Sequence, residues 1–399
     1  MKFVQLKLFA LDPSNRSLAL KYLFIGTAAT LPLTTTINGI LSFSLIACWL
    51  ASMILSRPNL KNVLTPFNMT MTFFFIVHVL GLIYTENMRV GLQHLERMYS
   101  YVIFPILFGS VAISEKTVRL AFLSFSVAAL LCSALYIFFD ELWLDEILTT
   151  NRTYRGLYLV ISVAILTNYL FTDTISKAMA TLCLTGIFSA IFLLAHTGAK
   201  MPIILTPLLL LIFLFTYFLK TGKIVLPLIL AIAAVISISV FVANNSFTKS
   251  RLMRLYTERF DYIRYRNWQT NLDVINKNLI LGVGTGDSLD ELQRARETWW
   301  QEYIDKYNSH NQYLETTLAV GLPGLITLLL IFGILCYNGF RRADFLLIAF
   351  SVVMVIGCVT ESLLQRQKGI IVLTFLIAGF VNTKRLGKMY QKSQSAADF

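Results

Sequence analysis

A single histidine lies where a long polar stretch meets a long apolar one, in the segment YNSHNQYLE at residues 307–315. The side chain of His310 can be neutral near pH 7 and accept a proton, which is what a general base for a hydroxyl nucleophile requires. The alternative is a histidine that caps a helix or lies at a membrane surface without a chemical role. The residue alone leaves both interpretations open.

Basic side chains near the ends of apolar runs are candidates for binding a phosphate or diphosphate group. Lys200 begins an apolar run directly after HTGA, where a cation needs an anionic partner or must reach the membrane surface. Arg264 and Arg266 lie in DYIRYRNWQTNL, and Arg152 and Arg155 lie in NRTYRGLY. Guanidinium groups bind phosphate oxygens in a bidentate manner, so a cluster of these residues would form a diphosphate site. Ordinary salt bridges are the alternative.

The stretch GVGTGD at residues 282–287 is the other motif with possible phosphate chemistry. It follows no clear strand and lacks the rest of either nucleotide fingerprint, so we predict a turn. The acidic residues at 140–146 are accompanied by no histidine and no DxD pattern. We therefore expect no metal and no other cofactor.

The elements that must position these residues are membrane helices. The chain has 399 residues, of which 56% are hydrophobic and 14% charged, and its mean hydropathy is +0.67. Apolar runs of about 20 residues, the length that crosses a bilayer, recur along most of it. We predict an all-α polytopic membrane protein with about twelve transmembrane helices. The predicted spans are 18–35, 38–56, 65–84, 97–113, 118–139, 155–172, 177–195, 201–219, 223–243, 310–338, 343–360 and 368–383.

The distribution of basic residues predicts the orientation of these helices. With the N-terminus in the cytoplasm, the short inside loops and the tail carry the series Arg57, Lys61, Lys116, Arg119, Lys177, Lys220, Lys223, Arg341, Arg342, Lys384, Arg385, Lys388 and Lys392. This agrees with the positive-inside rule, so the net charge of +12 gives no reason to expect nucleic acid as a partner. Both termini are then cytoplasmic, and His310 lies on the outer face.

The predicted domain division has four parts: helices one to nine (1–243), one long outer loop (244–309), helices ten to twelve (310–383) and a cytoplasmic tail (384–399). Within the loop, 262–279 and 288–306 are predicted amphipathic helices, with Trp268, Trp299 and Trp300 suited to a membrane interface. The loop is expected to cover the membrane surface as a lid. Gly321, Pro323 and Gly324 predict a kink in span ten.

A succession of motifs in 264–331 resembles a known family. Arg264-Tyr-Arg-Asn-Trp268, LILGVGTGD, HNQYL and GLPGLITLLL follow one another in that order. Together with about twelve helices and a large loop between the ninth and tenth, this succession resembles the O-antigen ligase and polymerase superfamily of bacterial envelope glycosyltransferases. The resemblance is most specific in this stretch and extends in layout over most of the chain.

The resemblance implies roles for individual residues. His310 would activate the hydroxyl of the acceptor sugar, and Arg264 would bind the diphosphate of an undecaprenyl-linked glycan donor. Residues 196–200, HTGAK, correspond to a helix-start motif that usually ends in Ser-Arg, so Lys200 replaces an arginine. A lysine keeps the charge but loses the bidentate fork.

Further residues are expected to support this site. Arg266, Arg155 and Arg152 are candidates for additional donor contacts, and Asn311 and Tyr313 for shaping the site. Residues 360–369, TESLLQRQKG, resemble the outward end of the last helix pair in some members. Glu361 and Arg366 are therefore secondary candidates.

The resemblance implies a bacterial inner-membrane enzyme with a periplasmic active site, whose partners are the lipid-linked donor, membrane lipids and an acceptor. The favoured acceptor is lipid A core, which makes the protein an O-antigen ligase, because one long loop is atypical of polymerases. A polymerase and a protein O-oligosaccharyltransferase remain alternatives. A glycan transporter is disfavoured, because the candidate cations gather at one surface and the halves show no repeat.

Overall fold

The computed structural model describes residues 13–383 apart from 57–62, 112, 140, 149–150, 173–174, 247, 251–252, 254–261 and 297–307. Every regular element in this part of the chain is helical. The first eight described helices are α2 (Pro13–Thr30), α3 (Thr35–Ser56), α4 (Pro66–Leu80), α5 (Met88–Met98), α6 (Ser100–Ser110), α7 (Glu115–Phe138), α8 (Glu141–Leu148) and α9 (Arg152–Thr172). They are followed by α10 (Lys177–Thr197), α11 (Lys200–Thr221), α12 (Val225–Asn244), α14 (Tyr262–Lys277), α15 (Ser288–Arg296), α16 (Gln312–Arg342), α17 (Phe345–Thr360) and α18 (Gln367–Ile371), which continues through a π-helical stretch.

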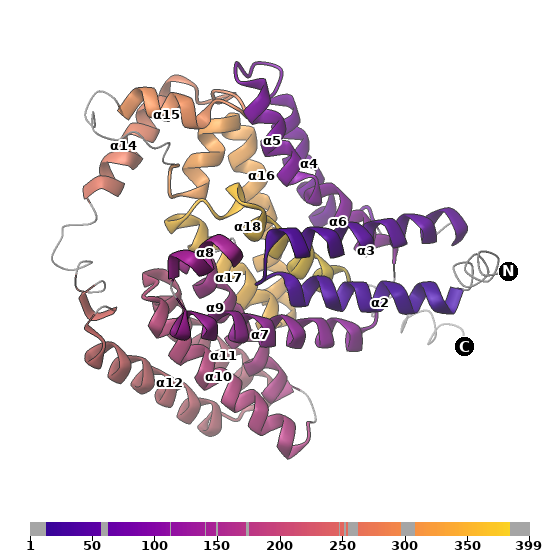
Figure 1. Cartoon of the computed structure of the whole chain (residues 1–399), viewed down its shortest axis with the longest axis vertical. Coiled ribbons are helices and arrows are strands. Elements are labelled where there is room, and N and C mark those ends of the chain that lie inside the picture. Colours follow the sequence, from indigo (N-terminus) through magenta and orange to yellow (C-terminus); the bar gives the residue numbers. More distant parts are fainter. Residues whose placement is uncertain are drawn as a thin grey trace.

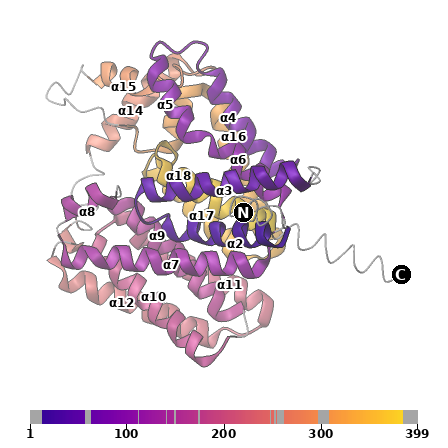
Figure 2. The same cartoon turned by 45° about the vertical axis from the view of Figure 1, so that its right-hand side comes forward.

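The helices form two regions joined by the C-terminal segment. One region contains α4, α5, α14, α15 and α16, and the other contains α7 to α12 (Figure 1). Helices α17 and α18 lie between the two regions in both views (Figure 2). Helix α9 packs against α7, α10, α11 and α17, and its apolar window is 78% buried, the highest value among the candidate spans in the described residues. It therefore forms the centre of the second region.

The predicted membrane class is confirmed, but the number of spans is only partly supported. Seven described helices are long and apolar enough to cross a bilayer: α3, α7, α9, α10, α11, α12 and α16. Helices α4 and α17 and the last helix, Gln367–Thr383, are apolar but shorter. The predicted span 97–113 is interrupted at Tyr99, and α6 has 11 residues. At 1.5 Å per residue it covers about 16 Å, roughly half of the hydrocarbon thickness.

Helix α16 folds back on itself where a kink was predicted. Val320 and Gly321 have non-helical backbone angles, and Gly321 has a φ of 63°. The rings of Tyr313 and Phe332 lie 6.3 Å apart between centroids, whereas a straight helix would separate these positions by about 28 Å. The short arm, 312–319, therefore runs back along the long arm, 322–342. The start of α16 is thus brought into the interior of the molecule.

The glycine-rich turn occupies the bend of α16. The backbone N–H groups of Val283 and Gly284 donate to the carbonyls of Leu318 and Ala319 at 2.8 and 3.0 Å. Gly282 has a φ of 74°, and a Cβ atom there would lie 2.6 Å from the Ala319 carbonyl. The predicted turn is confirmed, and these two amides bind protein carbonyls instead of a phosphate.

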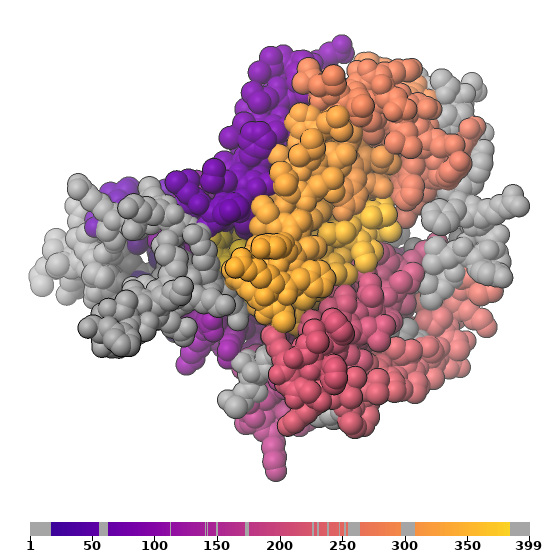
Figure 3. All heavy atoms as spheres, turned by 180° about the vertical axis from the view of Figure 1, so that it is seen from behind, coloured from indigo at the N-terminus to yellow at the C-terminus, as the bar shows by residue number. Residues whose placement is uncertain are grey.

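The first region is packed around α16. Seen from behind, the long orange surface of α16 adjoins the violet helices of residues 66–98 (Figure 3). Helices α14 and α15 pack against α16 as well. The predicted helix 262–279 is confirmed by α14, and the first half of 288–306 by α15. Trp299, Trp300 and the tail 384–399 lie outside the described residues.

Candidate functional site

His310 is held in an unusual backbone conformation just before α16. Its φ is 45°, a left-handed value found at only one other non-glycine residue of the described chain. The backbone N–H of His310 donates to Asn308 Oδ1 at 3.1 Å. Asn311 then caps α16, because its Oδ1 accepts from the backbone N–H groups of Tyr313 and Leu314 at 2.9 and 3.1 Å. Asn311 therefore fixes the direction in which the helix leaves His310.

Glu361 joins the two principal candidates. Its Oε2 lies 2.7 Å from Nδ1 of His310, and its Oε1 accepts from a terminal nitrogen of Arg264 at 3.2 Å. The side chains of His310, Glu361 and Arg264 are 18%, 21% and 32% exposed, so solvent screens these interactions only in part. Glu361, which the sequence indicated only as a secondary candidate, therefore lies at the centre of the site.

Contacts on both sides hold Glu361 in this position. Its backbone N–H continues the ladder of α17 by donating to Gly357 at 3.0 Å. Three residues further on, the Leu364 N–H donates to Gln312 Oε1 at 2.7 Å, and the Tyr154 hydroxyl donates to the Leu363 carbonyl at 3.1 Å. The segment after α17 is thereby tied to α16 and to α9. This double attachment fixes the carboxylate between His310 and Arg264.

Helix α14 holds the segment that precedes His310. The Trp268 indole donates to the Ser309 carbonyl at 3.0 Å, and the Asn267 amide donates to the Asn308 carbonyl at 3.1 Å. Arg264 lies one turn before Trp268 on the same helix. The spacing of the Arg-x-x-x-Trp motif therefore has a structural reason: one residue binds Glu361 while the other holds the backbone beside His310.

A buried polar network that the sequence analysis did not single out supports the same segment. Ser309 donates from Oγ to Asn271 Oδ1 at 2.6 Å and from its backbone N–H to Glu315 Oε2 at 2.9 Å. Arg296 donates from Nε to Asn267 Oδ1 at 2.9 Å. Asn267 and Asn271 could have indicated this network, because they lie four residues apart on one face of a predicted helix.

Lys200 begins α11 at the same end of the molecule as Glu361. Its neighbour Met201 approaches Gly357 in the last turn of α17, where a Cβ atom would lie 3.2 Å from the methionine methyl group. On the other side, Pro202 packs against Gly156 near the start of α9. The starts of α9 and α11 and the end of α17 therefore converge. Lys200 is half-buried at this junction.

Arg266 and Arg366 take different positions. Arg266 is half-buried on α14, two residues beyond Arg264, and its carbonyl accepts from the Thr270 hydroxyl at 2.9 Å. Arg366 is exposed and immediately precedes α18. Neighbouring Lys368, which the sequence analysis did not propose, is 6% exposed and donates from Nζ to the carbonyls of Leu33 and Leu148 at 2.6 and 2.7 Å. Lys368 thus ties the segment after α17 to the turn between α2 and α3 and to the end of α8.

Arg152 and Arg155 belong to a separate cluster. Both form ion pairs with Glu141 of α8, and Arg155 also lies 3.5 Å from Asp145. Arg155 is 5% exposed, and its guanidinium carbon lies 3.4 Å from the centroid of the Tyr136 ring. Their expected grouping with Arg264 is not observed in the described contacts, because the acids of α8 supply nearer partners.

The charge of this second cluster is strongly compensated. Burial alone would raise the pKa of the Glu141 carboxyl, but the hydrogen bonds from Arg152 and Arg155 outweigh burial and hold that pKa below its usual value. Burial raises the pKa of neighbouring Asp145. The cluster therefore connects α8 to α9 and α7 as a structural element.

Comparison with known proteins supports the motif-based resemblance. Residues 185–329 match the family model described as O-antigen ligase. No curated protein matches the chain. The matched range includes Lys200, the glycine-rich turn, Arg264 and His310, whereas Glu361 and the Arg152 cluster lie outside it. The chain is thus a multi-pass membrane protein that contains an O-antigen ligase family domain over residues 185–329.

Proposed function

We propose that the protein transfers a glycan from undecaprenyl diphosphate to a sugar hydroxyl of lipid A core on the periplasmic face of the bacterial inner membrane. The observation that carries this proposal is the bridge formed by Glu361 between His310 and Arg264. It brings a histidine and an arginine to either side of one carboxylate, which supports the roles proposed for them as proton acceptor and phosphate-binding cation. A transferase that joins a hydroxyl to a diphosphate-activated sugar needs both groups.

His310 is the proposed general base. An ionised carboxylate only accepts hydrogen bonds, so Glu361 selects the tautomer in which Nδ1 of His310 carries the proton. Nε2 is then the unprotonated ring nitrogen and takes the proton of the acceptor hydroxyl. The same hydrogen bond stabilises the imidazolium that results. Glu361 acts here as a positioning residue.

Arg264, Arg266 and Lys200 are the proposed donor-binding cations. The acceptor oxygen attacks the anomeric carbon as the bond from that carbon to the diphosphate oxygen breaks, and the bonding electrons leave with undecaprenyl diphosphate. Positive side chains stabilise the charge that develops on this leaving group. A single displacement inverts the anomeric centre. Arg152 and Arg155 have no part in the proposal because they pair with the acids of α8.

Lipid A core is the proposed acceptor, and two members of the same reaction class compete with it. A polymerase would use a second lipid-linked glycan, and a protein O-oligosaccharyltransferase would use a serine or threonine hydroxyl. All three share the donor chemistry. The single long loop between α12 and α16 is the feature that favours the ligase.

The proposal is tested with purified protein, undecaprenyl diphosphate glycan and rough lipopolysaccharide. Wild-type protein should extend the lipopolysaccharide, and His310→Ala should lower the initial rate by about 10²–10⁴-fold. Parallel reactions without lipopolysaccharide, or with a serine-rich acceptor protein, test the competing acceptors. If product forms only on lipid-linked glycan, the protein is a polymerase and not a ligase. If product forms only on the acceptor protein, it is a protein O-oligosaccharyltransferase.

Two outcomes would contradict the mechanism itself. An undiminished rate for His310→Ala would remove the general-base role. Wild-type protein that gives no product with any acceptor, but moves labelled lipid-linked glycan across vesicles, would favour a transporter.

A further inference from the structure

A pocket lies at the other end of the helices that carry the candidate site. Its volume is about 230 Å³, and it is lined by residues of α7, α9, α11, α17 and the last helix. Helix α11 extends from Lys200 to the pocket residue Lys220, which is about 30 Å at 1.5 Å per residue. Helix α17 likewise runs from Phe345 in the pocket to the residue before Glu361. The pocket and the His310 site are therefore on opposite sides of the molecule.

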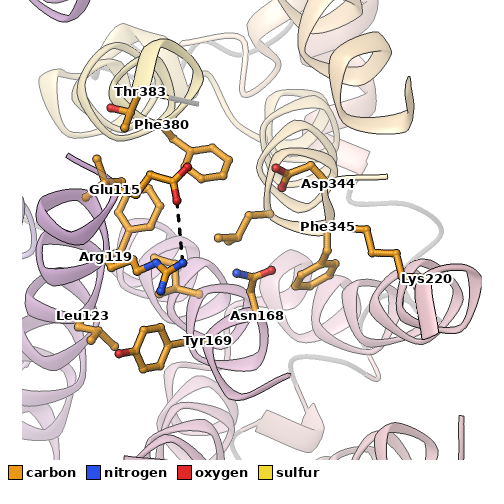
Figure 4. A pocket seen from close by; sticks show the side chains of 14 residues that line it. Glu115, Arg119, Leu123, Asn168, Tyr169, Lys220, Asp344, Phe345, Phe380 and Thr383 are labelled. Carbon is orange, nitrogen blue, oxygen red and sulfur yellow. Dashed lines mark ion pairs between the residues drawn. The ribbon is translucent and has the colours of Figure 1, made fainter. Parts of the chain in front are cut away.

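The polar lining of the pocket carries both signs of charge on two facing sides. Glu115 and Arg119 lie on one side, where they form an ion pair at 4.0 Å, and Asp344 and Lys220 lie on the other (Figure 4). Between them lies the amide of Asn168, and Phe122, Phe345 and Phe380 supply apolar surface (Figure 4). Such a pocket fits a compact group that itself carries a positive and a negative charge.

Asp344 has a carboxylate oxygen to offer such a group. One of its oxygens accepts from the Leu347 N–H and caps α17, at 3.3 Å. The described residues supply no further hydrogen bond or ion pair to this carboxylate. An ammonium group has three donors, which suits this oxygen, while the Arg119 guanidinium suits a phosphate.

The level of the pocket relative to the membrane indicates that the ligand is part of a lipid. Three candidate spans, Glu115–Phe138, Arg152–Phe171 and Lys200–Thr221, have the ends that line it, so it lies at the level of lipid headgroups. Its volume is below the 300–1,000 Å³ typical of sites for drug-sized ligands, so it admits a headgroup and not a whole lipid. We infer that this pocket binds the headgroup of a zwitterionic phospholipid with a primary amine, phosphate toward Arg119 and ammonium toward Asp344.

Native mass spectrometry of the full-length protein in detergent tests this inference. The protein is titrated separately with palmitoyl-oleoyl phosphatidylethanolamine and with the matching phosphatidylglycerol, which has the phosphate but no ammonium. The first equivalent of phosphatidylethanolamine should bind about tenfold more tightly, because one charge-assisted contact is added. Equal binding, or tighter binding of phosphatidylglycerol, would overturn the zwitterionic site.

Three variants separate the contributions. Asp344→Asn keeps the cap of α17, since asparagine caps as well as aspartate, and should abolish the preference for phosphatidylethanolamine. Arg119→Gln should weaken binding of both lipids. Lys116→Gln is the matched control, because Lys116 lies exposed on the same helix and does not line the pocket. Unchanged phosphatidylethanolamine binding in both Asp344→Asn and Arg119→Gln would show that the lipid binds elsewhere and would overturn the assignment of this pocket.

A final arm distinguishes the lipid from a soluble ligand. Free glycerophosphoethanolamine, a phosphodiester, carries the same charges without acyl chains. At the concentration at which the lipid occupies the pocket, glycerophosphoethanolamine should leave the lipid bound. Displacement at that concentration would assign the pocket to a soluble zwitterion and overturn the lipid assignment.

Discussion

The two ends of α9, α11 and α17 use charge in opposite ways. At the His310 end, Glu361 is shared between a histidine and an arginine, and buried hydrogen bonds fix the backbone around them. At the other end, Asp344, Lys220 and Arg119 line an open pocket. The first arrangement supports the proposed chemistry, in which a shared carboxylate sets the proton position of its neighbour. The second supports the proposed binding of a ligand by the charges that line the pocket.

The largest expected difference between the ends comes from removing the charge of Glu361. Glu361→Gln keeps a hydrogen-bond acceptor for Nδ1 of His310 but loses the carboxylate that stabilises the imidazolium. We expect kcat for glycan transfer to fall about 10–100-fold with little change in the KM for the acceptor. The pH–rate profile should also shift, which a merely structural contact would not cause.

The matched control for this change is Glu291→Gln. Glu291 pairs with Arg294 on α15, away from His310, and its loss should leave the rate within about twofold. Equal rates for Glu361→Gln and the wild type would show that the bridge has no part in the reaction.

The bend of α16 should be required for the His310 end. Gly282→Ala places a Cβ atom against the Ala319 backbone at a residue whose φ is 74°. We expect a loss of about 1–3 kcal/mol in the free energy of unfolding, measured by denaturant titration, because an L-residue is strained there. Gly333→Ala is the control, since a Cβ atom at Gly333 meets nothing within 4 Å. Similar stability of the two variants would argue against a tight fit of the turn into the bend.

Lys200 offers a smaller test at the same end. Lys200→Ala should weaken the use of the donor about tenfold, seen as a higher KM for undecaprenyl diphosphate glycan, because one charge-assisted phosphate contact is lost. Lys200→Arg should preserve or improve donor use, since the guanidinium fork restores bidentate binding. If both variants behave as the wild type, Lys200 does not contact the diphosphate.

The smallest effect is expected at the opposite end. Asp344→Asn should change glycan transfer by less than about twofold, because it keeps the cap of α17 and lies at the far end of that helix from Glu361. The measurement is the initial rate in detergent with a fixed lipid content. A rate loss as large as that of Glu361→Gln would show that the two ends are coupled through α17.

The sequence by itself determined the membrane class and the glycine-rich turn, and it indicated His310 and Arg264 as candidate site residues. Hydropathy is a property of contiguous residues, and a run of about 20 apolar residues selects a membrane helix whatever its neighbours. The same reasoning predicted a membrane span at 97–113, but the helix found there, α6, is too short to cross a bilayer.

Only the tertiary structure decided which charges meet. Glu361 is 51 residues from His310 and 97 from Arg264 along the chain, and no local pattern relates them. The same holds for Arg155, whose guanidinium is taken by the acids of α8, and for the two arms of α16, which fold back at Gly321. Partners in an ion pair are chosen by the distances that helix packing creates, and those distances depend on the whole fold at once.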